Sequence, residues 1–220
     1  MNYTFRFRDV FAAWDYLMEG VVMTLGLSAV TMVLGLLIGV ACAAGRLYGP
    51  GPLRAAIATY VEVIRNTPLL IQLFIVFFGL PGLGLRLDAT TAAVISLTIN
   101  LGAYATEIVR AGLQAVPRTQ VEAGHALGLS GFQVFRYVVL FPALKLMYPA
   151  LASQFILLML ATSIASQISV QDLFHTGSII QSRTFRDFEV YAVVGALYLA
   201  LSLAFRIAFS AVYVVAFGRR

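Results

Sequence analysis

Five long apolar runs alternate with short polar segments along the chain. They cover residues 21–45, 55–80, 89–108, 138–169 and 190–217. A helix that crosses a bilayer needs about 20 consecutive, mostly apolar residues, and each run is long enough. The pattern therefore predicts an all-α, polytopic membrane protein. We expect about five transmembrane helices, with the two termini on opposite sides of the membrane.

The composition supports a bilayer as the solvent. Of the 220 residues, 60% are hydrophobic and 11% are charged, whereas a soluble domain carries about a quarter charged residues. The net charge is +5, but the basic residues are scattered, which favours anchoring at the lipid surface over nucleic acid binding. We expect residues 1–220 to form a single transmembrane domain.

The cysteine and the histidines indicate no special chemistry. Cys42 is the single cysteine and lies inside an apolar run, so no disulfide within the chain is possible. His125 and His175 are isolated and lack partners at metal-ligand spacing. We therefore predict no metal and no cofactor in this chain.

The distribution of basic residues predicts the orientation. Basic residues flank the first loop, surround the third loop and end the chain: Arg46, Arg54, Arg110, Arg118, Arg136, Lys145, Arg219 and Arg220. The opposite side holds Arg6, Arg8, Arg86, Arg183 and Arg186. Because cytoplasmic loops carry an excess of lysine and arginine, this modest bias places the C-terminus in the cytoplasm and the N-terminus outside. Arg206, in the inner half of the fifth run, is expected to snorkel or to meet a partner.

The N-terminal segment mixes charges with aromatic residues. Residues 1–19 contain no apolar stretch of the kind found in a cleaved signal peptide. Trp14 and Tyr16 suit the depth of the lipid headgroups. We interpret residues 1–19 as an interfacial segment on the outer leaflet.

Small residues recur along the first apolar run at spacings of three and four. They are Thr24, Ser28, Thr31, Gly35, Gly39 and Ala43. This spacing places them on one helical face, where another helix can approach closely. The stripe predicts a close helix–helix contact, and one hypothesis is that two copies, or this chain and a related chain, pair across it.

The second apolar run contains a proline among polar residues. Pro68 removes a backbone donor and clashes with the carbonyl of Ile64, so the helix is expected to kink or break near Asn66. Glu62 and Arg65 lie three residues apart and are able to pair on a helix. Two interpretations remain open here: a structural Glu–Arg pair at the cytoplasmic interface, or a mobile break that lines a cavity.

Further polar residues lie in the third and fourth runs. Asn100, Tyr104 and Glu107 share one helical face, and Arg110 repeats the Glu-x-x-Arg spacing. Thr162 and Ser163 begin a polar stretch in the fourth run, although such hydroxyls often bond back to their own helix. The polar faces together suggest a shared aqueous pathway with these candidate residues: Asn66, Thr67, Pro68, Gln72, Asn100, Tyr104, Thr162 and Ser163.

The segment between the third and fourth runs reads as a short helix with defined ends. Pro117 is suited to start it at Arg118, and Gln120 and Glu122 fall in its first turns. Gly128 is suited to end it, and Ser130 is able to cap the next helix. Ala123, Gly124 and Ala126 give a low-profile face that is able to lie in a groove of another protein.

The polar motifs of the chain resemble those of a known family, the permease subunits of bacterial ABC importers. The stretch from 122 to 142 is similar to the EAA loop of these permeases, with Glu122, Ala123, Gly124 and Gly128 at the motif positions. The stretches 19–28, 60–81 and 103–124 resemble signatures of the polar amino acid uptake branch. The resemblance covers nearly the whole chain in the right order.

The resemblance implies a fold, a function and partners. It implies the type I importer permease core, with residues 111–135 as a cytoplasmic coupling-helix loop that an ATPase dimer grips through Arg118, Gln120, Glu122, Ala123, Gly124 and Gly128. ATP and Mg would be held by that ATPase. It further implies a second permease chain (more often different than identical), a periplasmic amino-acid-binding protein, a small polar amino acid as substrate, and the bacterial inner membrane.

Three positions depart from the family pattern. Gly124 replaces an alanine, and the proline of the Leu-Pro pair is displaced to Pro142. Leu160 and Ala161 stand where the family usually has a lysine followed by a polar or acidic residue. The missing charge indicates a substrate without a strongly cationic side chain, or a stronger site on a partner permease.

Other function classes fit less well. An ATPase needs Gly-Lys-Ser/Thr to hold phosphates, and the single lysine, Lys145, follows Leu144, so this chain is not expected to be an enzyme. An intramembrane hydrolase needs a nucleophile beside a base, and His125 has no serine elbow nearby. A stand-alone secondary transporter or channel stays open as the alternative, although no internal repeat or buried acid pair supports it.

Overall fold

The computed structural model describes residues 4–218, which fold as helices joined by short connections. No strand is present in this part of the chain, and the all-α prediction is confirmed. The α-helices are α1 (Arg8–Ala12), α2 (Trp14–Tyr48), α3 (Gly51–Arg65), α4 (Leu69–Phe74), α5 (Ala89–Gln114), α6 (Arg118–Ala126), α7 (Gly131–Gln133), α8 (Leu140–Ala161), α9 (Leu173–Thr184) and α10 (Asp187–Phe217). Four π- or 3-10 segments continue them: η1 (Ile75–Gly79), η2 (Leu80–Leu83), η3 (Val134–Val139) and η4 (Thr162–Ile168).

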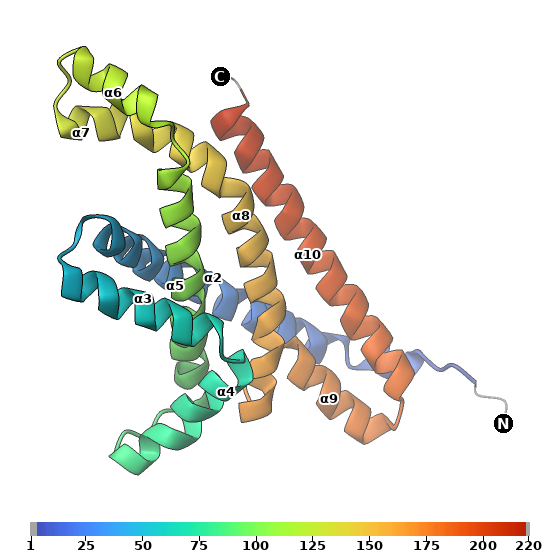
Figure 1. Cartoon of the computed structure of the whole chain (residues 1–220). Coiled ribbons are helices and arrows are strands. Elements are labelled where there is room, and N and C mark those ends of the chain that lie inside the picture. The colour runs from blue at the N-terminus through green and yellow to red at the C-terminus, as the bar shows by residue number, and fades with distance from the viewer. Residues whose placement is uncertain (1–3, 219–220) are drawn as a thin grey trace.

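The number of membrane-crossing helices agrees with the sequence pattern. Four helical stretches are long and apolar enough to cross a bilayer, at 14–48, 89–114, 131–168 and 187–217. Residues 51–65 and 69–83 form a fifth candidate that is bent by 107°. In Figure 1, α6, α7 and the C-terminal end of α10 lie at one end of the bundle, while α9 and the N-terminal end lie toward the other.

The first long helix begins earlier than predicted. It starts at Trp14 rather than near residue 21, so residues 14–19 belong to α2 and only α1 and its flanks remain as a separate N-terminal element. Leu17 is fully buried in a cluster with Leu173 and Val190. Because one side of this first turn packs on α9 and α10, the helix continues through a stretch whose exposed charges pointed to an interface. The predicted anchors Arg219 and Arg220 lie outside the described residues, as do residues 1–3 of the predicted interfacial segment.

The small-residue stripe of α2 is buried within the chain. All six of its residues are buried, and α2 and α5 form the most extensive helix pair in the structure. A Cβ at Gly35 would lie 2.7 Å from the side chain of Leu101, and one at Gly39 would overlap Ala105. The predicted close approach is confirmed. The hypothesis that two copies, or this chain and a related chain, pair across this stripe is wrong, because α5 and α9 already cover it.

A buried carboxylate, that of Asp172, holds the start of α9 against α10. Asp172 precedes α9, accepts a hydrogen bond from the backbone N–H of His175 (3.0 Å) and accepts another from the hydroxyl of Tyr198 (3.1 Å). The side chain is fully buried, and this burial raises the pKa of Asp172. The arrangement caps α9 and ties it to α10.

Candidate functional site

The predicted break at Pro68 is present and is repaired by one side chain. α3 ends at Arg65, α4 begins at Leu69, and the chain turns sharply between them. The amide nitrogen of Gln72 donates to the carbonyl oxygens of Ile64 (2.7 Å) and Thr67 (3.0 Å). The carbonyl of Ile64 is the one that proline cannot serve, so Gln72 replaces the missing backbone donor.

Three of the predicted pathway residues meet at this break. The amide nitrogen of Gln72 also lies 2.9 Å from the hydroxyl of Thr67, and its carbonyl oxygen accepts a hydrogen bond of 3.0 Å from the side chain of Asn100. Gln72 is 8% exposed. Its polar atoms are therefore occupied in holding α3, α4 and α5 together, which is a structural role that the sequence pattern alone did not reveal.

A polar pocket lies beside the break, where α2, α3 and α5 meet. Its volume is about 380 Å³. The residues that line this polar pocket are Arg46, Val61, Glu62, Arg65, Asn66, Tyr104 and Glu107. Asn66 and Tyr104 were predicted pathway residues, and both face it. The polar pocket thus gathers most of the charged side chains that the sequence placed inside or near the membrane.

Glu107 is the centre of an ion-pair network in the polar pocket. Its carboxylate lies 2.6 Å from the guanidinium of Arg110, as the spacing predicted, and 2.8 Å from that of Arg46. The second pair joins the end of α2 to α5. The position of Arg46 beside the first apolar run indicated only a membrane anchor, and no local pattern signals a partner 61 positions away.

Of the two interpretations of Glu62 and Arg65, the structural ion pair is wrong. The ion pairs within residues 4–218 do not include it. The guanidinium of Arg65 instead lies over the ring of Tyr104, 5.2 Å from its centroid. This cation–π contact holds Arg65 toward α5 and away from the carboxylate three residues earlier on its own helix.

Thr162 and Ser163 do not join the polar pocket. Thr162 is fully buried, and its hydroxyl donates to the carbonyl of Met159 at 2.7 Å. The hydroxyl of Ser163 donates to the carbonyl of Leu160 at 2.7 Å. Both bond back to their own helix at the start of η4, so neither hydroxyl is brought to the residues that line the polar pocket.

The loop between α5 and α8 has the predicted helix and ends. α6 runs from Arg118 to Ala126 directly after Pro117. Gly128 adopts a φ of 78°, a left-handed conformation that favours glycine. Ser130 and Gln133 form a reciprocal capping box at the start of α7. The local chemistry of these residues decided the geometry of the loop.

The exposed surface of α6 differs from the predicted face in one residue. Arg118, Gln120, Glu122 and Ala123 are exposed, as a docking surface requires. Gly124 is instead buried, and a Cβ there would lie 3.1 Å from Val134 and 3.4 Å from Val138 of the same chain. Gly124 therefore lets α6 pack on η3 and does not form part of the outward face.

Sequence reasoning missed three exposed apolar side chains next to α6. Leu127, Phe132 and Tyr137 are 81%, 76% and 71% exposed. They flank the polar surface of α6 on the segment that leads into α8. Large apolar residues inside an otherwise polar loop were the available signal, because exposed apolar side chains that gather together mark protein or membrane contact sites.

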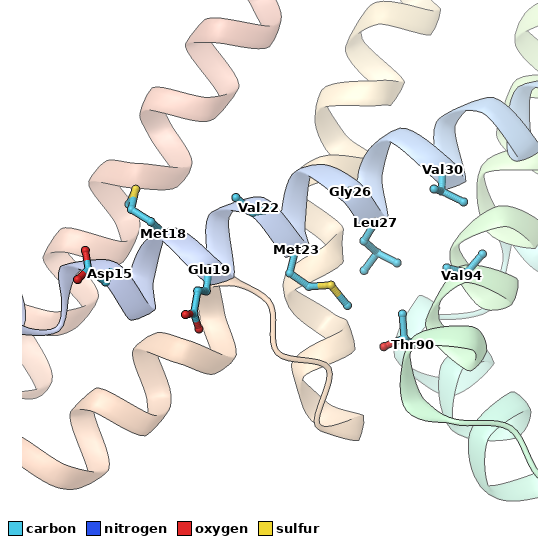
Figure 2. Close-up of a pocket in the computed structure, with 10 residues that line it drawn as sticks. All are labelled: Asp15, Met18, Glu19, Val22, Met23, Gly26, Leu27, Val30, Thr90 and Val94. Carbon is cyan, nitrogen blue, oxygen red and sulfur yellow. The ribbon is translucent and has the colours of Figure 1, made fainter.

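A more apolar hollow lies away from the polar pocket. Its volume is about 750 Å³, and Figure 2 shows its lining side chains on the first half of α2 and on Thr90 and Val94 of α5. Asp15 and Glu19 lie at one end, and the other walls are almost all apolar. None of the predicted site residues lines this hollow.

Comparison with known proteins gives a consistent result. Residues 35–214 match the family described as the binding-protein-dependent transport system inner membrane component. The L-cystine transport system permease protein of Bacillus subtilis is 38% identical over 170 residues, which cover 77% of this chain and 73% of that protein. The glutamine transport system permease protein of Escherichia coli is 36% identical over 201 residues, which cover 90% of this chain and 92% of that protein.

Solved structures share the fold. A crystal structure of an amino acid ABC transporter with histidines contains a chain that is 36% identical, with a TM-score of 0.91 over 96% of this chain and 99% of that chain. The inward-facing methionine ABC transporter has a TM-score of 0.78 at 21% identity, over 93% of this chain and 98% of that chain. These matches span almost the whole chain, which therefore belongs to the family of binding-protein-dependent transport system inner membrane components.

Proposed function

We propose that this chain is the membrane-spanning permease subunit of an ATP-driven importer and forms the translocation pathway for a polar amino acid. The observation that carries the proposal is the polar pocket, a charged cavity between three helices of an otherwise apolar bundle. Charged side chains inside a membrane protein are costly unless they serve a function. The similar permeases named above carry glutamine or L-cystine, which supports a polar amino acid as substrate.

The energy for transport comes from a separate ATPase subunit dimer in this proposal. ATP and Mg bind there, since this chain lacks the Gly-Lys-Ser/Thr of a P-loop. The exposed residues of α6 and the apolar side chains of Leu127, Phe132 and Tyr137 form the contact surface. A helix with defined ends that packs on η3 through Gly124 is suited to transmit a displacement into α8.

A second permease chain completes the pathway. Glu62, Arg65 and Asn66 are exposed in this chain, although they lie within the bent candidate span of residues 51–83. Facing lipid, the charges of Glu62 and Arg65 would be strongly destabilising, so another protein surface or a water-filled passage must cover them. We expect this partner to be a different chain and not a second copy. The reason is that Leu160 and Ala161 lack the charge that the family usually has at these positions.

The proposed setting is the bacterial inner membrane. The chain acts as one permease domain, with the N-terminus and residues 1–19 outside and α6 and the C-terminus in the cytoplasm, as the basic residues favour. A periplasmic binding protein then delivers the amino acid to the segments 81–88 and 171–188. These segments include the exposed side chains of Leu83 and Phe185.

Reconstitution tests the proposed function. The permease, its ATPase, its partner permease and the binding protein are placed in proteoliposomes, and uptake of radiolabelled amino acids is measured with ATP inside. We expect ATP-dependent uptake that also requires the binding protein. Uptake that persists without any ATPase would contradict the proposal and favour a stand-alone transporter.

A pair of variants tests the docking surface. Ala123→Trp adds bulk to the exposed face of α6 and should abolish co-purification of the ATPase. Ser182→Trp adds the same bulk to the exposed surface of α9 and should leave co-purification intact. Equal co-purification in both variants would show that α6 is not the docking surface.

A further inference from the structure

The carboxylate of Glu62 and the guanidinium of Arg65 face the same polar pocket without binding each other. Neither forms an ion pair or a side-chain hydrogen bond to another described residue, and Arg65 makes a cation–π contact with Tyr104. Two opposite charges on neighbouring turns of one helix normally attract. Their separation leaves one anion and one cation on the wall of a single cavity, each without an ion-pair partner among residues 4–218.

The other charges of the polar pocket are already neutralised. Glu107 would be the natural partner for Arg65, but its two oxygens are held by Arg46 at 2.8 Å and by Arg110 at 2.6 Å. The network thus keeps Arg65 available. Asn66 adds a third polar group, because its amide nitrogen donates to the backbone carbonyl of Glu62 at 2.8 Å and leaves its amide oxygen unused by the described residues.

We propose that Glu62 binds the α-ammonium group and Arg65 the α-carboxylate of a zwitterionic amino acid in the polar pocket. This inference rests on the proposed transport function and assigns it a site. The volume of about 380 Å³ falls within the range of roughly 300–1,000 Å³ that is usual for small-molecule sites. A guanidinium is suited to grip a carboxylate with two parallel hydrogen bonds. Asn66 provides a further acceptor for the ammonium group.

The charge balance predicts the class of side chain. The charged residues that line the polar pocket balance, since Arg46 and Arg65 stand against Glu62 and Glu107. Arg110, which pairs with Glu107 from outside the lining, adds one positive charge to the site. A side chain with a positive charge is therefore disfavoured, because it would find no free carboxylate once Glu62 holds the ammonium group. The site suits an amino acid with an uncharged polar side chain.

The test measures how tightly a radiolabelled amino acid binds to the nucleotide-free permease–ATPase complex in nanodiscs, without the binding protein. The probe is radiolabelled L-glutamine, or another neutral amino acid if the reconstituted complex accumulates that one instead. Competitors are the analogue that lacks the carboxylate (γ-aminobutyramide for glutamine) and the analogue that lacks the ammonium group (glutaramate). We expect each analogue to compete about tenfold less well than the amino acid itself.

Single-residue variants should show which charged side chain binds which group of the amino acid. In Glu62→Gln, binding should weaken about tenfold and the penalty for removing the ammonium group should disappear, while the penalty for removing the carboxylate stays. Arg65→Gln should show the reverse. Asp15→Asn and Arg54→Gln, which change exposed charges outside the polar pocket, should leave both penalties as in the wild type.

Two results would overturn the site assignment. One is that both variants keep the full discrimination against both analogues. The other is a complex that transports lysine or arginine and binds no neutral amino acid. In either case ATP-dependent uptake would continue to support the proposed function, whereas the absence of uptake of any amino acid would contradict that function itself.

Discussion

The side-chain amide of Gln72 donates a hydrogen bond of 2.7 Å to the backbone carbonyl of Ile64, across the gap between α3 and α4. An uninterrupted helix would satisfy this carbonyl from the backbone nitrogen of residue 68, which is a proline here. A side chain four residues beyond the proline therefore supplies what the backbone lacks. The break can persist inside an apolar bundle because its freed carbonyl is paired.

The first prediction concerns this repair. Gln72→Leu removes the donor and should lower the free energy of unfolding by about 1–3 kcal/mol, the cost of a buried unsatisfied polar group. In a Pro68→Ala background the backbone nitrogen of residue 68 becomes a donor, so the same change should cost less. Chemical unfolding of the four proteins in detergent measures the difference. Equal costs in the two backgrounds would contradict the interpretation.

The second prediction concerns the contact between α2 and α5. A Cβ at Gly39 would overlap Ala105, whereas a Cβ at Gly26, on the same helix, meets nothing within 4 Å. Gly26→Ala should stabilise the protein by up to about 1 kcal/mol through helix propensity. Gly39→Ala should be less stable than Gly26→Ala by about 1–3 kcal/mol because of overpacking.

Thermal unfolding in nanodiscs compares these two glycine variants. A partial recovery in the double variant Gly39→Ala/Ala105→Gly would identify the contact as the cause. Equal stability of the two single variants would show that α2 and α5 can separate to admit a methyl group.

The third prediction concerns the ion-pair network. Glu107→Gln removes the carboxylate that serves both Arg46 and Arg110, and it should lower the free energy of unfolding by about 1–3 kcal/mol. Glu62→Gln is a matched change in the same polar pocket at a carboxylate without an ion-pair partner among the described residues. It should change stability by no more than about 0.5 kcal/mol. Similar losses in both variants would be inconsistent with this network.

The fourth prediction concerns pH. Burial raises the pKa of Asp172 above its value in the unfolded chain, so the charged form is disfavoured in the folded protein. Protonation relieves this cost, and the stability contributed by Asp172 should rise as pH falls from neutral through its raised pKa. Asp172→Asn keeps a capping side chain but cannot titrate. The wild type should gain in Tm relative to Asp172→Asn on acidification, and parallel changes in Tm would contradict the assignment.

Several features followed from the sequence because their causes are local. Pro68 ends a helix wherever it stands, and the break appears between Arg65 and Leu69. The limits of α6 were predicted from Pro117 and Gly128. The hydrophobic runs indicated the membrane-crossing helices, because length and polarity alone decide which segments suit a bilayer.

Other features were decided by contacts between distant parts of the chain. The spacing of Glu62 and Arg65 allowed an ion pair, but Tyr104, on another helix, holds the arginine. The spacing of Glu107 and Arg110 allowed an ion pair in the same way, and that ion pair forms. Spacing along a helix states which side chains are able to meet, whereas the competing partners from other helices determine which of them do.

The sequence by itself determined the class of the protein, its membrane-crossing segments, the break at Pro68 and the form of the α6 loop, since each depends on neighbouring residues and on the solvent. Only the tertiary structure decided that α5 and α9 cover the stripe of α2, that Gln72 repairs the break, and that Arg46 reaches Glu107. These depend on the register between packed helices. Because a small shift in that register would present different side chains, it cannot be derived from spacing within one helix.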